Sequence, residues 1–429
     1  MSRSLFRSPL SAGLALLMVL VPNAPPVSAQ EQPTAPVSDD SLSPRFRVVV
    51  DAVNRAMQQS QTPGVSIGVL ADGHEEVASF GVTSVETNEP VRPDTRFQIG
   101  SITKTFTATA LMQLVERGEV NLDAPVRTYV PEFRVADPEV SANVTVRNLL
   151  THTGGWWGDS VTDTGDGPDA IARFIDEKMP AFPQLAPSGE YFTYNNSGLV
   201  VAGRVIEVVT GKTYREAMQD LVLEPLGLDQ STFDPDAVLA LPHSEGHAAT
   251  ADGPRVQQPL FIPRNAEPAG GLHSTAHDML QYARFQMGDG TTPSGIRLLS
   301  ADTLGRMHSP QAPPPPTGDR MGFTWFVHTH GVPALQHSGG TYGQVSILAI
   351  LPEQGLALVV LANTQPTASN AHSGGDVTGA AVRAFVQTYL PGGVCAYVGQ
   401  RDVVEQPAAA DLSGYAGDCA PRRLKEGSM

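Results

Sequence analysis

Ser101 and Lys104, three residues apart, are the pair in this chain with the clearest capacity for chemistry. Positions i and i+3 of a helix share one face, so a deprotonated lysine amine there could take the serine proton and leave an alkoxide-like nucleophile. The chain has only four lysines and otherwise uses arginine, which cannot give up its proton in a protein. The spacing is compatible with a self-activated nucleophile, but the tetrapeptide alone is as well explained by a serine-capped helix start with an exposed lysine, and the rest of the chain has to decide.

Tyr194 and Asn196 are candidates for a second proton-transfer group and for a substrate-binding group. They follow Pro187-Ser188-Gly189 and precede a helical pattern. A tyrosine near a lysine ammonium can have a lowered pKa and act as a base or an acid. An asparagine two residues on could hold both the lysine and a substrate amide. An ordinary turn before a helix is the alternative interpretation.

A third group of residues, His337, Ser338, Gly339 and Gly340, precedes a β-rich run and is expected on or next to an edge strand. Glycines permit close approach of a ligand, and their N–H groups could serve an oxyanion. His337 could donate a hydrogen bond or carry a partial charge near pH 7. On its own the pattern is equally typical of a glycine-rich turn.

Both ends of the globular part show strand signals and covering helices. Near the start, helical spacing over 46–59 is followed by alternating apolar residues over 65–69, an Asp72-Gly73 turn and a return strand over 77–81. Near the end, β-rich runs over 344–351 and 356–363 are followed by a helical pattern over 377–390. These patterns predict an α+β fold with one antiparallel sheet built from both chain ends.

The middle of the chain, about 140–310, has mostly helical patterns joined by Gly/Pro loops. Helices are expected from Thr145, over 197–210 and over 275–287, and the helix after Ser101 should end at Gly118. Four prolines, 313–316, form an extended linker to the later strands. The sequence therefore predicts a mostly helical domain inserted between the two halves of the sheet.

The termini have separate roles in this interpretation. Residues 1–29 have two arginines, an apolar run and a small-residue site ending at Ala29, which predicts a secretory signal peptide and an exported protein, periplasmic or secreted. The apolar run is shorter than the roughly 20 residues of a spanning helix, so no stable membrane anchor is expected. Residues 30–44 are expected to form a flexible leader. Pairing of Cys395 with Cys419 stays open.

Composition narrows the function further. Hydrophobic content is 41%, charged content 17% and formal net charge -16 over 429 residues. This suits a globular protein and argues against a nucleic acid or anionic membrane partner, which leaves a small-molecule or peptide substrate. Histidine pairs such as His243/His247 lack acidic or cysteine partners at ligand spacing, so no metal is expected.

In this order and spacing, the three motifs resemble those of the class C β-lactamase and DD-peptidase family. The resemblance extends to Pro93–Gly100, Leu149–Gly155 and Pro268–Leu272 and covers about residues 45–390. It implies a β-lactamase/transpeptidase-like hydrolase domain over 45–395. Residues 396–429 would be a tail, and Asp411–Gly417 within it resembles the opening of a small β module that many relatives carry.

The resemblance also implies roles for the residues. Ser101 would form an acyl-enzyme, Lys104 and Tyr194 would share the proton transfers, and the N–H groups of Ser101 and Gly340 would form the oxyanion hole. Asn196 would hold a substrate amide, with His337, Ser338 and Gly339 also in the substrate-binding set. No cofactor is implied. Which of Lys104 and Tyr194 is the base stays open.

One departure bears on the substrate. Class C β-lactamases have Lys-Thr-Gly where this chain has His337, Ser338 and Gly339. A lysine supplies a permanent positive charge for an antibiotic's carboxylate, whereas histidine is mostly neutral at pH 7. The expected enzyme is therefore a hydrolase of D-amino-acid peptides, esters or, weakly, β-lactams. The alternatives are a penicillin-binding-like protein that acylates but barely turns over, and a structural protein with remnant motifs.

Overall fold

A seven-stranded antiparallel sheet organises the chain. The computed structural model describes residues 42–160, 162–315, 319–365 and 374–393, and within them the strand order is β2-β1-β11-β10-β9-β8-β7. Each neighbouring pair in this sheet is antiparallel. The strands are β1 (Gly64–Ala71), β2 (His74–Gly81), β7 (Arg320–Met321), β8 (Phe326–His328), β9 (Ala334–Thr341), β10 (Gln344–Leu351) and β11 (Leu356–Ala362).

The pairing of β1 with β11 joins the two ends of the globular part. Val65 of β1 lies opposite Ala362 of β11, and the register continues to Leu70 opposite Ala357. All seven residues of β11 are buried, because helices cover both faces of the sheet. The predicted α+β fold, with one sheet built from both chain ends, is confirmed.

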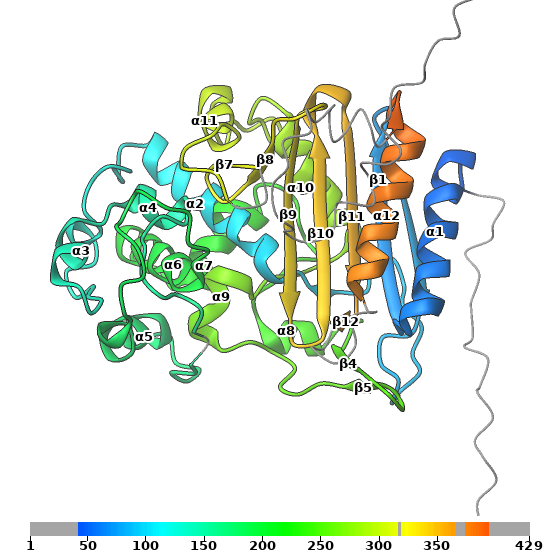
Figure 1. Ribbon diagram of the computed structural model, residues 1–429, viewed down its shortest axis with the longest axis horizontal. Helices are drawn as coiled ribbons and strands as arrows, with labels where there is room; N and C mark the ends of the chain where they lie inside the picture. Colours follow the sequence, from blue (N-terminus) through cyan, green and yellow to red (C-terminus); the bar gives the residue numbers. More distant parts are fainter. Residues whose placement is uncertain (1–41, 161, 316–318, 366–373, 394–429) are drawn as a thin grey trace, which may run out of the picture. The chain divides into compact units, whose positions relative to one another are not determined.

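Two helices cover one face of this sheet, and a third lies on the other. The helices α1 (Pro44–Ser60) and α12 (Gly374–Tyr389) pack against each other and against the sheet, as the blue and orange helices of Figure 1 show. The helix α10 (Ala276–Met287) packs against β1, β10 and β11. Alternate residues of β11 divide between the two cores: Leu358 and Val360 face α1 and α12, and Val359 and Leu361 face the helical region.

Local signals account for the first three elements. Ser43 caps α1 by accepting a hydrogen bond from the N–H of Phe46, so the helix begins slightly earlier than the apolar spacing indicated. Between β1 and β2, Asp72 and Gly73 both have positive φ, 53° and 78°, as a two-residue hairpin turn requires. The predicted helix, strand and hairpin are confirmed.

The predicted helical region is present, with one addition. Its helices, together with the one that follows Ser101, are α2 (Thr103–Glu116), α3 (Pro138–Asn143), α4 (Val146–Leu150), α5 (Ala170–Glu177), α6 (Asn196–Thr210), α7 (Tyr214–Met218), α8 (Pro235–Leu239), α9 (Glu267–Gly270), α10 and α11 (Ala301–Met307). The hairpin of β4 (His247–Thr250) and β5 (Gly253–Val256) was missed, although Asp252-Gly253 is a turn signal. The strand β12 (Thr364–Gln365) pairs with β4 and adds a third strand to this hairpin. In a separate small sheet, β6 (His273–Ser274) pairs with β3 (Phe97–Gln98).

Several predictions fall outside the described residues. These are the signal peptide, the leader up to residue 41, Cys395 with Cys419, and the tail 396–429. Of the prolines at 313–316, the first three are described and connect α11 to β7 without helix or strand. Among the described helices, none has the length and apolar character needed to cross a membrane.

The sheet core gives a stability prediction. Leu358 is fully buried in β11 between α1, α12 and the neighbouring strands, so Leu358→Ala should leave a cavity and lower the free energy of unfolding by about 2–5 kcal/mol. Urea unfolding of the purified protein measures this. Leu239→Ala, at a leucine that is 52% exposed, is the matched control and should change it by less than about 0.5 kcal/mol. Equal effects of the two would contradict the assigned core.

Candidate active site

The backbone before Ser101 is clamped to the sheet. The N–H of Ile99 donates to the carbonyl of Leu272 at 2.9 Å, and the Ser346 hydroxyl of β10 donates to the carbonyl of Ile99 at 2.7 Å. Gly100 then turns the chain with φ of 54°. Ser101 lies in a short 3-10 turn, Gly100–Ile102, that leads directly into α2. Ser101 is therefore held at the start of a buried helix, as its sequence context predicted.

Glycines bring β9 against this turn. A Cβ atom on Gly339 would lie 2.0 Å from the carbonyl oxygen of Ile99, and one on Gly100 would lie 2.6 Å from the amide nitrogen of Gly340. Neither contact is possible for a larger residue without movement of the backbone. The Gly340 amide therefore lies beside the nucleophile turn, where the resemblance placed an oxyanion donor.

The segment of β9 beside Ser101 is a local edge. Pairing with β8 stops at Gln336, whereas pairing with β10 continues to Thr341. From His337 to Thr341, β9 thus has a strand partner on one side only. The expectation of an edge strand is confirmed for this segment, although β9 itself lies inside the sheet. Ser338 and Gly340 are exposed at this edge.

Lys104 is the buried cation of the site. It is fully shielded from solvent, and its Nζ donates to Ser101 Oγ at 2.9 Å and to the carbonyl of Ala269 at 2.7 Å. Burial lowers the pKa of Lys104 to about 7, against a smaller opposing effect of the Asp159 carboxylate. Near neutral pH a substantial fraction of this lysine is therefore an uncharged amine in contact with the serine hydroxyl.

Tyr194 lies across the Lys104 amine. Its ring centroid is 5.0 Å from Nζ, and its hydroxyl hydrogen-bonds Ser101. The predicted lowering of its pKa is wrong. Burial raises the pKa of Tyr194, the hydrogen bond from Ser101 partly opposes this, and the Asp159 carboxylate adds to it. The phenol is thus protonated at neutral pH, although 38% of the residue remains exposed.

Sequence reasoning left His152 out of the site, yet it packs beneath Tyr194. The two rings stack with centroids 4.5 Å apart, and His152 is fully buried in a left-handed conformation with φ of 55°. Its sequence signal was the stretch Leu149–Gly155, which contributed to the family resemblance.

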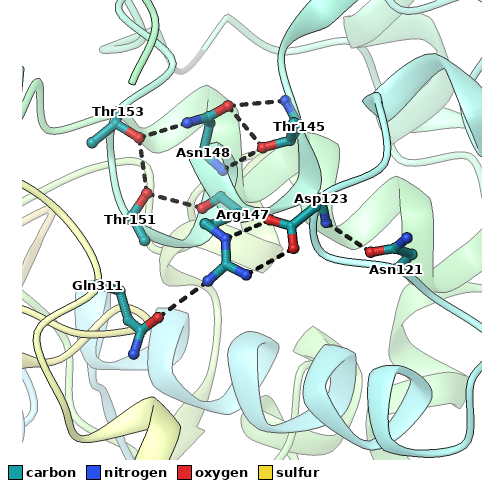
Figure 2. A network of polar contacts seen from close by, with 8 residues as sticks. All are labelled: Asn121, Asp123, Thr145, Arg147, Asn148, Thr151, Thr153 and Gln311. Atoms are coloured by element: carbon teal, nitrogen blue, oxygen red, sulfur yellow. Dashed lines mark hydrogen bonds and ion pairs between the residues drawn. The ribbon is translucent and has the colours of Figure 1, made fainter. Parts of the chain in front are cut away.

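A polar network holds this unusual conformation in place. Thr151 and Thr153, the chain neighbours of His152, hydrogen-bond each other and reach Arg147 and Asn148 of α4, as Figure 2 shows. Asn148 forms a capping box at the start of this helix. Arg147 in turn binds Asp123 and Gln311, which ties α4 to two distant loops. The network fixes the backbone under Tyr194.

The hydrogen bonds of the two buried histidines assign their tautomers. Nδ1 of His152 accepts the N–H of Asn195 at 3.0 Å, so its proton lies on Nε2. Nδ1 of His337 lies 2.6 Å from the Ser338 carbonyl and must donate, so its Nε2 carries a lone pair. Within the described residues, neither Nε2 has a hydrogen-bond partner. His152 thus offers a donor and His337 an acceptor.

His337 is uncharged at physiological pH. It is 1% exposed, and burial together with the neighbouring Lys104 lowers the pKa of His337 to about 3. The expected partial charge near pH 7 is therefore wrong, because an imidazolium would lose its hydration beside another cation. Burial likewise holds the pKa of His152 well below its ordinary value.

Asn196 does not bind Lys104, contrary to expectation. It begins α6, and its Nδ2 donates to Oδ1 of Asp159 at 2.8 Å; the described residues show no hydrogen bond between Asn196 and Lys104. Asp159, which sequence reasoning missed entirely, lies in an exposed loop with no motif to mark it. Of the two tryptophans in this loop, Trp156 is buried and its Nε1 donates to Ser197 Oγ, whereas Trp157 is 41% exposed.

The described part of the chain contains no cluster of three or more His, Cys, Asp or Glu suited to a metal ion. The paired histidines have other contacts: Nδ1 of His247 binds the carbonyl of Asn363, and Nδ1 of His277 pairs with Glu75. The site residues that converge are therefore a serine, a lysine, a tyrosine, two neutral histidines and a backbone amide, which suit nucleophilic attack on a carbonyl.

Comparison with known proteins agrees with this geometry. The sequence profile described as Beta-lactamase matches residues 49–382. The chain belongs to the Beta-lactamase family. It is accordingly an enzyme, a serine hydrolase of the β-lactamase and penicillin-binding-protein type, and its sheet and helices form the β-lactamase/transpeptidase-like fold.

Individual relatives span several names within this family. Penicillin-binding protein 4 of Amycolatopsis lactamdurans is 36% identical over 312 residues, covering 71% of this chain and 82% of that protein. A beta-lactamase of Lysobacter lactamgenus is 29% identical, covering 59% of this chain and 64% of that protein. The octameric penicillin-binding protein homologue from Pyrococcus abyssi superposes with a TM-score of 0.62 at 27% identity, covering 75% of this chain and 74% of that one.

The close contact of β9 with the nucleophile turn can be tested by mutation. Gly339→Ala should reduce hydrolytic activity by about a hundredfold, because the added Cβ would push the backbone at Ile99 and displace Ser101. Steady-state kinetics with a chromogenic ester measure the loss. Gly305→Ala in α11 is the matched control, since nothing lies within 4 Å of its Cβ position, and it should retain full activity. A fully active Gly339→Ala enzyme would refute the contact.

Proposed function

We propose that the protein is an exported serine hydrolase that cleaves an amide or ester through an acyl-enzyme on Ser101. The observation that carries the proposal is the 2.9 Å contact between Ser101 Oγ and the desolvated amine of Lys104. A lysine whose pKa is about 7 can exist as the free base at physiological pH, which an exposed lysine cannot. The same contact favours Lys104 over Tyr194 as the group that accepts the serine proton.

Acylation then follows in balanced steps. Lys104 takes the proton of Ser101, and Oγ bonds to the substrate carbonyl carbon while the N–H groups of Ser101 and Gly340 stabilise the oxyanion. When the tetrahedral intermediate collapses, the bond to the leaving group breaks. Tyr194, a protonated phenol, supplies the proton that the leaving group needs. The Lys104 ammonium then returns a proton to the Tyr194 phenolate, whose ring centroid lies 5.0 Å from Nζ.

Deacylation uses the same groups in reverse. A water molecule attacks the ester carbonyl, its proton passes by way of Tyr194 to neutral Lys104, and Ser101 leaves with a proton returned from that lysine. His152 supports the Tyr194 ring from below. Ser338, exposed on the free edge of β9, and Asn196 are the proposed contacts for the substrate backbone.

Three observations bear on the substrate. His337 is neutral and buried, so the site lacks the fixed cation that a β-lactam carboxylate would meet at this position. The described residues superpose on SurE solved with D-Leu with a TM-score of 0.67 at 28% identity, which supports a D-amino-acid carbonyl as substrate. The relationship to Penicillin-binding protein 4 favours, as a second candidate, a protein that acylates but barely turns over.

Export is part of the proposal. Its support is the pattern of residues 1–29, where an apolar run between arginines and Ala29 is typical of a cleaved signal peptide. The hydrolase would then act in the periplasm or outside the cell, on a small molecule or peptide.

Intact mass spectrometry after mixing with benzylpenicillin tests the nucleophile. The wild-type chain should gain the mass of the opened antibiotic, and Ser101→Ala should gain none, because no other hydroxyl hydrogen-bonds the Lys104 amine in the described residues. Ser309→Ala, at a half-buried serine distant in sequence, is the matched control and should be acylated normally. A lasting adduct would favour the penicillin-binding candidate. Turnover of esters and D-peptides by Ser101→Ala would refute the proposal.

The pH dependence tests Lys104 as the base. The acylation rate should rise as pH increases through about 7, because only the deprotonated amine accepts the serine proton. Lys104→Arg should abolish that rise and reduce the rate by at least about 10³-fold, since arginine stays charged. Stopped-flow acylation between pH 5 and pH 9 measures both. Lys178→Arg is the conservative control, and a flat wild-type profile would exclude Lys104 as the base.

A further inference from the structure

One carboxylate, that of Asp159, acts on the reacting groups of the site. This residue is exposed, lies in the loop after the second tryptophan, and accepts a hydrogen bond from Asn196 at the start of α6. Its carboxylate raises the pKa of both Lys104 and Tyr194, and its hydrogen-bond partner Asn196 lies two residues after Tyr194 in the chain. Sequence motifs gave no role to Asp159.

The loop holds Asp159 at a defined position. The N–H of Ser197 in α6 donates to the carbonyl of Gly158 at 2.9 Å, so the residue before Asp159 is tied to the helix that carries Asn196. A Cβ on Gly158 would lie 1.8 Å from Oδ1 of Asn195, so the loop and the helix start are in direct contact. The carboxylate is therefore fixed relative to Asn196 by its backbone as well as by its side chain.

The Asp159–Asn196 pair offers hydrogen-bond acceptors to a substrate. Donation from Asn196 Nδ2 to Asp159 Oδ1 leaves Oδ1 of Asn196 and Oδ2 of Asp159, for which the described residues show no hydrogen-bond partner. Two oxygens, one of them carrying charge, suit a group with several N–H donors and a positive charge. A primary ammonium has both.

The rest of the site does not offset this charge. Lys104 is the cation that contacts Ser101 and Tyr194, and it is partly neutral at physiological pH. His337 occupies the position of the family's lysine and is uncharged. The segments between 42 and 393 that the structure does not describe contain no lysine or arginine. An anionic substrate group would thus meet a carboxylate without a compensating cation.

We propose that Asp159 and Asn196 bind the protonated amino group of the acyl donor, so that the enzyme prefers substrates with a free α-amino group next to the scissile carbonyl. Amino-acid amides, amino-acid esters and peptides cleaved after a free N-terminal residue belong to this class. This inference rests on the proposed acyl-enzyme at Ser101 and specifies its substrate. N-acylated and anionic acyl donors, β-lactams included, are poor substrates by the same reasoning.

The test compares D-alanine methyl ester with N-acetyl-D-alanine methyl ester, whose acyl groups differ in the charged amine. The full mature protein should hydrolyse the free amine with a kcat/KM about tenfold or more higher, as expected for a charge-assisted contact at an exposed site. Asp159→Asn should remove that preference, because it should lower kcat/KM for the free amine far more than for the N-acetyl ester. Asp159→Glu, which keeps the negative charge, should keep part of the preference for the free amine.

Two controls separate the possible failures. Asp163→Asn, in the same loop, should keep the preference, because Asp163 binds the N–H of Gly165 and not Asn196. Hydrolysis of p-nitrophenyl acetate, compared between wild type and Ser101→Ala, reports the proposed acyl-enzyme by itself. If that ester is cleaved through Ser101 but the two alanine esters are equal, or Asp159→Asn lowers both equally, the amino-group inference is overturned. If Ser101→Ala cleaves p-nitrophenyl acetate like the wild type, the proposed function fails instead.

Discussion

The removal of one lysine amine from water is the interaction on which the rest of this site depends. Lys104 keeps two hydrogen bonds, to Ser101 and to the Ala269 carbonyl, and no carboxylate hydrogen-bonds it in the described residues. A directly paired carboxylate would keep the amine protonated, whereas burial without one favours the neutral base. The fold must therefore surround this amine tightly and supply a carbonyl in place of an acid.

The carbonyl that binds Lys104 belongs to Ala269 in the short helix α9, and an ion pair anchors this helix. Glu267, the first residue of α9, is 5% exposed and receives three hydrogen bonds from Arg215 at 2.5, 3.0 and 3.1 Å. The Thr107 hydroxyl of α2 donates to the carbonyl of Pro268, one residue before Ala269. The ion pair thus orders α9, while Lys104, which binds the carbonyl of Ala269 two residues after Glu267, has no carboxylate hydrogen-bond partner in the described residues. The Arg215–Glu267 ion pair positions α9, whereas the Lys104 amine has no such partner and can therefore be a neutral base.

The sequence predicted the elements better than the contacts between side chains. Helices and strands follow from apolar spacing, caps and turn residues, all of them local, so α1, β1 and α6 fall within a few residues of their expected bounds. The Ser101 and Lys104 contact was also predictable, because one helical turn fixes it. The direction of the Tyr194 pKa shift could not be predicted, because it depends on how much protein surrounds the hydroxyl. Asn196 was misplaced because its partner, Asp159, lies 37 residues away in a loop without a motif.

This division between local and distant determinants explains why the family fold is compatible with several substrates. The nucleophile, its base and the glycine edge of β9 are built from helix and strand geometry, which leaves little freedom: a Cβ at Gly339 would meet the backbone of Ile99. Asp159 lies instead in an exposed loop attached to α6 by one backbone hydrogen bond and one side-chain hydrogen bond. The charge that a substrate meets can change in such a loop without disturbing Lys104 or Ser101. Substitution of lysine by a buried, neutral His337 removes a cation in the same way, by altering a side chain and leaving the strand that carries it intact. In the proposed mechanism, the packed core of this enzyme thus fixes reactivity, and exposed charges set selectivity.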